Sequence, residues 1–271
     1  MKKVLYFHGG PGLNSNPERN LLKERYASAG INLLCWDEPS RLRTSGTSPW
    51  KKYDFKEYLN SSEDFFLQNH TGSPLCIMAH SFGSHAALYQ AQKHPDKIAT
   101  IIFVSSDLSL EHADQNMFTF TMLDYKEHGD TKYKDLENII ANYSGKFDQN
   151  TFHGFQLLLE NPRLFDYYWS DKIIMNRFLN HYSGPAYAID VESFFSVRKS
   201  FYILEKKRCS KPIVSIYGSD DIVISKNAEI VKLGEYFQNI EVFTVENAAH
   251  YPHLEQFDQC LSIILNELHK Y

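Results

Sequence analysis

Residues 75–84 read LCIMAHSFGS, and this stretch predicts a strand, a sharp turn and the start of a helix. The apolar run Leu75–Ala79 has the length of a buried strand, and a helical pattern follows it. A turn that presents a serine between strand and helix is strained, so the residues two before and two after the serine must be small. Ala79 and Gly83 meet this requirement. Ser81 is therefore a candidate nucleophile, and a chance Ser-x-Gly in an ordinary turn is the alternative.

On both sides of this turn, apolar runs alternate with helical patterns. The predicted strands are Val4–Phe7, Ile31–Trp36, Leu75–Ala79, Ile98–Val104, Ile213–Tyr217 and Ile240–Val245. The predicted helices cover residues 16–29, 56–69, 82–94, 227–237 and 254–269, and a polar loop is expected over 37–50. Such alternation predicts an α/β protein, in which parallel strands are joined by right-handed crossovers and helices cover both faces of the sheet.

The segment 107–205 interrupts this alternation, because it has helical patterns but no buried strand. It holds 19 of the 39 aromatic residues, and its 15 acidic and 9 basic residues give it a net charge of −6. We expect a helical lid, 107–205, inserted into a core formed by 1–106 and 206–271. A plain extension of the core, with aromatic side chains used only for packing, is the alternative.

The composition is that of a globular protein and disfavours several function classes. Apolar residues make up 43% of the chain and the net charge is −5, so neither disorder nor a nucleic-acid partner is expected. The four cysteines form no C-x-x-C pair, which argues against zinc and against a disulfide scaffold. The N-terminal apolar run is too short for a signal peptide, and no stretch approaches a membrane span. A soluble cytoplasmic protein is the expectation.

A glycine-rich loop, His8-Gly9-Gly10-Pro11-Gly12, follows the first predicted strand. Such a loop can turn a backbone N–H toward the serine, and the donors we expect are the N–H groups of Gly10 and Phe82. Together they would form an oxyanion hole. An ordinary Gly/Pro turn is the alternative. Phosphate binding is disfavoured, because the chain has neither G-x-G-x-x-G nor a G-K-[ST] loop here.

Candidate acids and a candidate base follow later strands. Asp221 is the preferred acid, Asp220 beside it is expected to be solvated, and Asp107 after the fourth strand is a second possibility. His250, which follows the last strand, could act as the general base. Its spacing to His253 resembles a metal pair, but no third ligand pattern accompanies it, so no metal is expected. Serine, acid and histidine thus occur in the order Ser…Asp…His, unlike the chymotrypsin and subtilisin types.

These motifs together resemble the serine hydrolases of the α/β-hydrolase fold, over residues 2–106 and 206–270. The resemblance rests on HGGPG at 8–12, AHSFGS at 79–84, HPDK at 94–97, GSDD at 218–221 and AAHYPHLE at 248–255. It implies that Ser81 is the nucleophile, Asp221 the acid and His250 the base, with Gly10 and Phe82 at the oxyanion hole. It implies no metal and no organic cofactor.

HGGPG is also the hallmark of the proline iminopeptidase branch, from which the chain departs in one motif. That branch usually has Gly-Gly-Ser-Trp-Gly around the serine, whereas this chain has Ala-His-Ser-Phe-Gly. The branch uses lid carboxylates to hold the substrate's free amine. Glu160, Asp166, Asp190 and Glu192 are available here, but no alignment assigns them, so the substrate-binding residues of the lid stay unassigned.

The resemblance also sets expectations for the sheet and the reaction. Family members usually have two further strands before the one that enters the glycine loop, and here that strand starts at residue 2 or 3. We therefore expect about six strands, all parallel, in the order second, first, third, fourth, fifth, sixth. The expected function is hydrolysis of small carboxylic esters or amides. The alternatives are an aminopeptidase acting on short peptides and a non-catalytic binding protein. The oligomeric state is not predicted.

Overall fold

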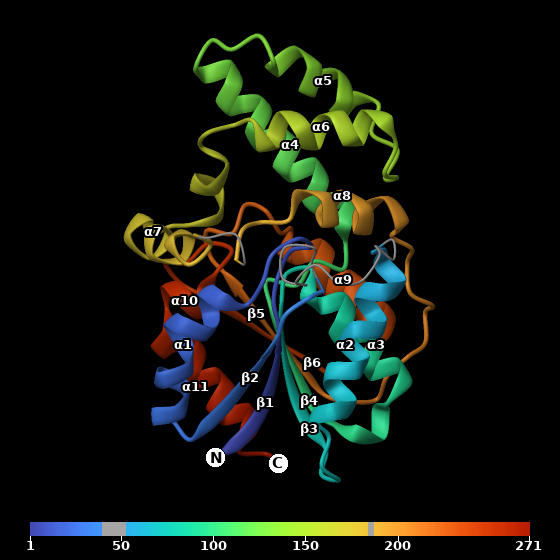
Figure 1. The fold of residues 1–271 in the computed structure, drawn as a ribbon, viewed down its shortest axis with the longest axis vertical. Helices are drawn as coiled ribbons and strands as arrows, with labels where there is room; N and C mark the ends of the chain where they lie inside the picture. The colour runs from blue at the N-terminus through green and yellow to red at the C-terminus, as the bar shows by residue number, and fades with distance from the viewer. Residues whose placement is uncertain (40–52, 184–186) are drawn as a thin grey trace, which may run out of the picture.

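The computed structural model describes residues 1–39, 53–183 and 187–271. Six strands form one sheet in these residues, in the order β2-β1-β3-β4-β5-β6, and every neighbouring pair is parallel (Figure 1). The strands are β1 (Lys2–Phe7), β2 (Ile31–Trp36), β3 (Leu75–His80), β4 (Ile98–Val104), β5 (Ile213–Gly218) and β6 (Ile240–Val245). The predicted parallel sheet and its strand order are confirmed.

Helices cover both faces of the sheet (Figure 1), as expected from the alternation. Helices α1 and α11 lie on one face, and α2, α3 and α9 lie on the other. Their bounds are α1 (Asn16–Ser28), α2 (Phe55–Asn69), α3 (Gly83–Lys93), α9 (Lys226–Tyr236) and α11 (Phe257–Leu268). Two short elements, η1 (Pro95–Lys97) and α10 (Pro252–Glu255), precede β4 and α11.

The strands were visible in the sequence because both of their faces are buried. In β1, Leu5 and Phe7 pack with the layer of α2 and α3, whereas Val4 and Tyr6 pack with the layer of α1 and α11. All four side chains are buried. A strand that is covered on both sides gives a continuous apolar run instead of an alternating pattern.

The residues between β4 and β5 form helices above the carboxyl end of the sheet (Figure 1). They are α4 (Leu110–Glu127), α5 (Tyr133–Ala141), α6 (Gln149–Leu159), η2 (Leu164–Tyr168), α7 (Lys172–Asn180) and α8 (Val191–Ser200). Helices α4, α5 and α6 share an apolar cluster that includes Phe118, Leu136 and Phe155. The insertion is therefore helical where it is described. Its treatment as a lid with boundaries at 107 and 205 stays a prediction.

The expected last helix, 254–269, is wrong in one respect, because two helices occupy this region. Gln256 separates α10 from α11 with φ −126° and ψ 56°, and its side chain donates a hydrogen bond to Asn247 O at 3.0 Å. Most of the expected loop 37–50 lies outside the described residues, which stop at 39 and resume at 53. Within the described part of the chain, no helix is both long enough and apolar enough to cross a membrane.

Candidate active site

Ser81 occupies the sharp turn between β3 and α3. Its φ is +49°, a left-handed conformation that is uncommon for a residue with a side chain. The turn also brings α3 against the backbone at the end of β1, where a Cβ on Gly83 would lie 2.5 Å from Phe7 O and 2.6 Å from His8 O. The small residue expected at this position is thus required by close backbone approach. Strain of this kind is typical of functional sites.

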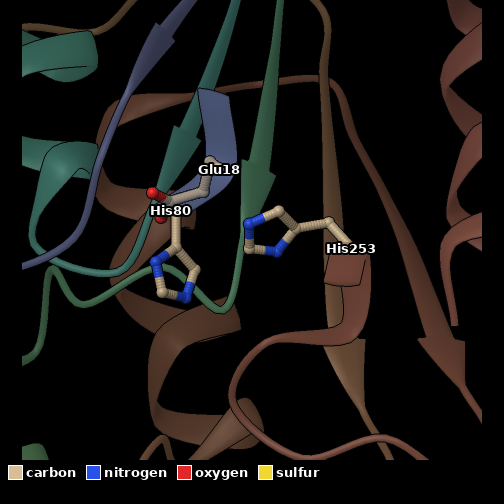
Figure 2. A group of neighbouring side chains, drawn as sticks. All are labelled: Glu18, His80 and His253. Carbon is tan, nitrogen blue, oxygen red and sulfur yellow. The ribbon is translucent and has the colours of Figure 1, made fainter. Parts of the chain in front are cut away.

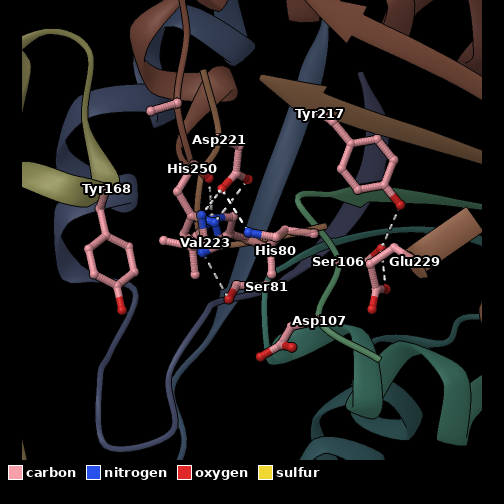
Figure 3. A network of polar contacts seen from close by, with 12 residues as sticks. His80, Ser81, Ser106, Asp107, Tyr168, Tyr217, Asp221, Val223, Glu229 and His250 are labelled. Atoms are coloured by element: carbon pink, nitrogen blue, oxygen red, sulfur yellow. Dashed lines mark hydrogen bonds and ion pairs between the residues drawn. The ribbon is translucent and has the colours of Figure 1, made fainter. Parts of the chain in front are cut away.

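The structure brings Ser81, His250 and Asp221 into one hydrogen-bonded chain (Figure 3). Ser81 Oγ lies 3.0 Å from His250 Nε2, and His250 Nδ1 lies 3.1 Å from Asp221 Oδ2. The side chains of His250 and Asp221 are each only 2% exposed. Asp221 follows β5 and His250 follows β6, so neighbouring parallel strands deliver both residues to the same edge as Ser81.

Asp221, and not its neighbour, is held toward the histidine. Its Oδ1 accepts hydrogen bonds from the N–H groups of Val223 and Ile224, both at 3.0 Å, which leaves Oδ2 for His250. Asp220 is exposed and accepts a hydrogen bond from Ser170 Oγ at 2.9 Å. Asp221 thus faces the histidine and Asp220 the solvent, while the catalytic role of Asp221 stays a prediction.

Gly218, at the end of β5, allows the loop that carries His250 to pack closely against this strand. A Cβ at Gly218 would lie 2.2 Å from the carbonyl oxygens of both Ala248 and Ala249. Gly218→Ala is therefore expected to displace this loop and to lower the free energy of unfolding by about 1–3 kcal/mol. Chemical denaturation measures the loss. Gly234→Ala is the control, because nothing lies within 4 Å of its Cβ in α9. It is expected to stabilise the protein by up to about 1 kcal/mol, and equal losses in the two variants would contradict the steric argument.

The two expected oxyanion donors lie on either side of Ser81. Gly10 belongs to the loop after β1 and lines the same pocket as Ser81. Phe82 follows Ser81 directly and is the N-cap of α3, while its ring is buried against Tyr58 in the core. Pairing of β1 with β3 places the two loops next to each other. Their role as donors stays a prediction.

A cavity of about 140 Å³ opens over Ser81, and the helical insertion forms much of its wall. Sequence reasoning left these lining residues unassigned. They are mostly apolar, and they include Met117 from α4, Phe155 and Leu158 from α6, Tyr168 from η2 and Phe194 from α8. A small apolar cavity of this kind suits the apolar part of a small ligand.

The four acids of the insertion that the sequence left unassigned do not line the cavity formed by the described residues. Glu160 pairs with Lys132, Asp166 pairs with Lys172, and Asp190 caps α8. These three and Glu192 are absent from the cavity wall formed by the described residues. Two other acids, Asp107 and Asp114, take their place there.

Asp107, the second candidate for the triad acid, lies on the cavity wall instead of beside His250 Nδ1, which Asp221 occupies (Figure 3). Burial, followed by the nearby Glu229 carboxylate, raises the pKa of Asp107 well above its ordinary value. Glu229 also shapes this loop, because it accepts hydrogen bonds from Ser106 Oγ at 3.1 Å and from Leu108 N at 3.0 Å.

Asp114 forms a buried ion pair with Arg198 at the boundary of the cavity. Tyr143 also donates a hydrogen bond to Asp114 Oδ2 at 2.8 Å. A buried charge of either sign is costly without its partner. The pair joins α4 to α8, so it fixes part of the helical insertion over Ser81.

A second cluster of titratable side chains includes His80, the residue that precedes Ser81 (Figure 2). Glu18, His80 and His253 each offer one possible metal-ligand atom, and these atoms lie within 4.8 Å of one another. The Tyr6 hydroxyl already connects two of them: it donates to Glu18 Oε1 at 3.0 Å and lies 3.2 Å from His253 Nε2. His80 Nε2 lies 2.9 Å from His250 O. Protein groups thus contact one polar atom of each side chain, while Glu18 Oε2, His80 Nδ1 and His253 Nδ1 are buried without a hydrogen-bond partner among the described residues.

Glu18 in this cluster gives the folded state a pH-dependent stability. Burial raises its pKa from 4.5 to about 7, so the folded protein holds a proton that the unfolded chain has lost. Stability is therefore expected to fall as pH rises from about 4.5 to about 7. Glu18→Gln removes this dependence and keeps an acceptor for Tyr6. The free energy of unfolding of Glu18→Gln, relative to that of wild type, should rise by about 1–3 kcal/mol between pH 5 and pH 8. Urea denaturation at both values measures it, and a constant difference would contradict the prediction.

Comparisons with known proteins agree with this architecture. No curated protein sequence matches the chain, but solved structures do. An esterase from Thermogutta terrifontis is similar with a TM-score of 0.62 and 14% identity, covering 100% of this chain and 90% of the esterase. The 2-hydroxy-6-oxo-6-phenylhexa-2,4-dienoate hydrolase from Rhodococcus sp. strain RHA1 is similar with a TM-score of 0.65 and 14% identity, covering 99% and 91%.

A third similar structure is Est816, described as an N-acyl homoserine lactone degrading enzyme. It has a TM-score of 0.62 and 14% identity, and the match covers 98% of this chain and 93% of Est816. At such low identities these structures establish the fold alone. The sequence model of the alpha/beta hydrolase fold, however, matches residues 2–257 directly. With nearly the whole length matched and the six-stranded parallel sheet in place, the chain belongs to the alpha/beta hydrolase fold family.

Proposed function

We propose that this protein hydrolyses small carboxylic esters or amides through an acyl-enzyme on Ser81. One observation carries the proposal: Ser81 Oγ, His250 and Asp221 form a continuous hydrogen-bonded chain, and Ser81 and His250 line an apolar cavity. A serine hydroxyl is a weak nucleophile until an adjacent base removes its proton. The family's similar structures, among them an esterase and a lactone-degrading enzyme, support a hydrolytic reaction.

The reaction follows from the roles of these groups. His250 Nε2 takes the proton of Ser81 Oγ as the oxygen attacks the substrate carbonyl, and the Gly10 and Phe82 N–H groups stabilise the oxyanion. His250 then gives the proton to the leaving group. A water molecule, deprotonated by His250, attacks the acyl-enzyme and releases the acid. Asp221 holds the imidazole in the correct tautomer and stabilises its charged form.

An aminopeptidase that releases an N-terminal residue such as proline is the second candidate. The observation that favours it is the pair of acids on the cavity wall, Asp107 and Asp114, where Arg198 is the one Lys or Arg among the described lining residues. A carboxylate in a cavity can pair with the ammonium group of a free N-terminus. The HGGPG loop at residues 8–12 is consistent with the same candidate.

The two candidates differ in their need for a free amine. We would compare p-nitrophenyl butyrate with proline p-nitroanilide and with its N-capped form. Ester cleavage without anilide cleavage would support the esterase. Saturable anilide cleavage that capping abolishes would support the aminopeptidase. A fluorophosphonate should add one adduct at Ser81 by peptide mass mapping, and labelling elsewhere would refute the assignment. Labelling without turnover on any ester or amide would favour a ligand-binding protein.

A further inference from the structure

We infer that His80 is a positioning residue for His250, an inference that rests on the proposed function. His80 precedes Ser81 in the chain, and its Nε2 lies 2.9 Å from the carbonyl oxygen of His250. The two imidazole rings also pack with centroids 4.9 Å apart. His80 therefore connects the turn that holds the nucleophile with the backbone of the residue that must deprotonate it.

The chemistry of this contact fixes the state of His80. A carbonyl oxygen can only accept, so His80 Nε2 must carry the hydrogen and donate it. Burial, followed by the neighbouring His253 and His250, lowers the pKa of His80 well below its ordinary value, so the ring is neutral. A neutral ring matters, because a charged one would repel the imidazolium that forms on His250 during the reaction.

The cluster behind His80 holds its ring in place. The ring packs on Tyr251 with centroids 4.4 Å apart and on His253 with centroids 4.9 Å apart. His253 is in turn anchored through the Tyr6 hydroxyl to Glu18. This chain of contacts links Tyr6 in β1 and Glu18 in α1 with His80 at the end of β3 and His253 in α10. Figure 2 shows Glu18, His80 and His253 of this chain.

Holding the backbone of His250 should affect the chemical step more than substrate binding. A displacement of about 1 Å in a reacting group can cost about 100-fold in rate. His80→Phe keeps an aromatic ring and removes the donor, so we expect kcat to fall by about 10- to 100-fold with little change in KM. His80→Gln places an amide N–H near the position of Nε2 and should restore kcat to within a few-fold of wild type.

Thr100→Val is the control for a general loss of packing. Thr100 is buried in β4, where its hydroxyl bonds Glu267 at 2.6 Å and Pro212 O at 3.2 Å, away from His250. Its kcat should stay near wild type even if its melting temperature falls. If His80→Phe kept the kcat of wild type, or if His80→Gln lost as much as His80→Phe while folded, the inference would be wrong.

A second readout does not depend on turnover. The proton between His250 Nδ1 and Asp221 gives a low-field NMR resonance when the hydrogen bond is held. We expect His80→Phe to broaden or shift this resonance, and His80→Gln to keep it. An unchanged resonance in His80→Phe would overturn the inference even if no substrate were turned over. Failure of the proposed function is a separate outcome, seen as wild-type activity that survives Ser81→Ala.

Discussion

Ser81→Ala is expected to lower kcat by roughly 10⁴- to 10⁶-fold for a substrate of this protein. The substitution removes the Oγ atom that lies 3.0 Å from His250 Nε2 and leaves the rest of the site in place. Under the proposed function no acyl-enzyme can form without it, and the remaining rate would come from the proposed oxyanion donors acting on water. The bond between Ser81 Oγ and the substrate carbonyl forms only in the transition state, so kcat and kcat/KM should fall together.

The measurement is steady-state hydrolysis of p-nitrophenyl butyrate by purified wild type and variant. Ser62→Ala is the matched control, since Ser62 is also buried but lies on α2, where its hydroxyl bonds Leu59 O at 2.7 Å. It should lose some stability and keep its kcat. If Ser81→Ala retained more than about one hundredth of the wild-type kcat, the nucleophile would have to be sought elsewhere.

The core of the fold could be predicted because its signals are local. Each strand is a continuous apolar run, and each following helix starts after a recognisable turn, so parallel strands with right-handed crossovers could be predicted. The strand order was expected from the resemblance to the α/β-hydrolase fold. The turn at Ser81 was visible for the same reason, because Gly83 must be small to clear the backbone at Phe7 and His8. A steric requirement of this kind can be recognised directly in the sequence, because only a small residue satisfies it.

The cavity wall could not be predicted, because it forms where distant segments meet. Met117, Phe155 and Phe194 come from three different helices of the insertion, and nothing in their local pattern separates a cavity-lining aromatic residue from a packed one. The surroundings of a charged side chain cannot be predicted from its local sequence either. Glu18 looks like an ordinary first-turn acid of α1, yet it is buried against Tyr6, because tertiary packing and not helix position decides its surroundings.

Asp221 and Asp107 illustrate what the sequence can predict about the site and what it cannot. Asp221 could be chosen from its place after β5, since the carboxyl ends of neighbouring parallel strands meet at one edge. Asp107 has an equivalent place after β4, and only the three-dimensional structure shows that it faces the cavity and not His250. Sequence position thus predicts that a residue lies at the carboxyl edge of the sheet, while side-chain contacts determine which chemical role it can have.

Asp221→Asn is expected to lower kcat by roughly 10⁴-fold. Asn keeps an oxygen that can accept the N–H groups of Val223 and Ile224, so the loop geometry should survive. Its amide would then donate to His250 Nδ1, which forces the hydrogen of the neutral imidazole onto Nε2. In that tautomer the nitrogen facing Ser81 has no lone pair and cannot remove the serine proton.

The control is Asp220→Asn, because Asp220 is the adjacent residue, is exposed and bonds Ser170 instead of His250. Its kcat should stay within a few-fold of wild type. Both variants remove one negative charge from the same loop, so the comparison separates the orientation of His250 from the general field of the site. Equal losses would assign the effect to charge alone. A large loss confined to Asp221→Asn would mean that the tautomer of His250 controls the reaction.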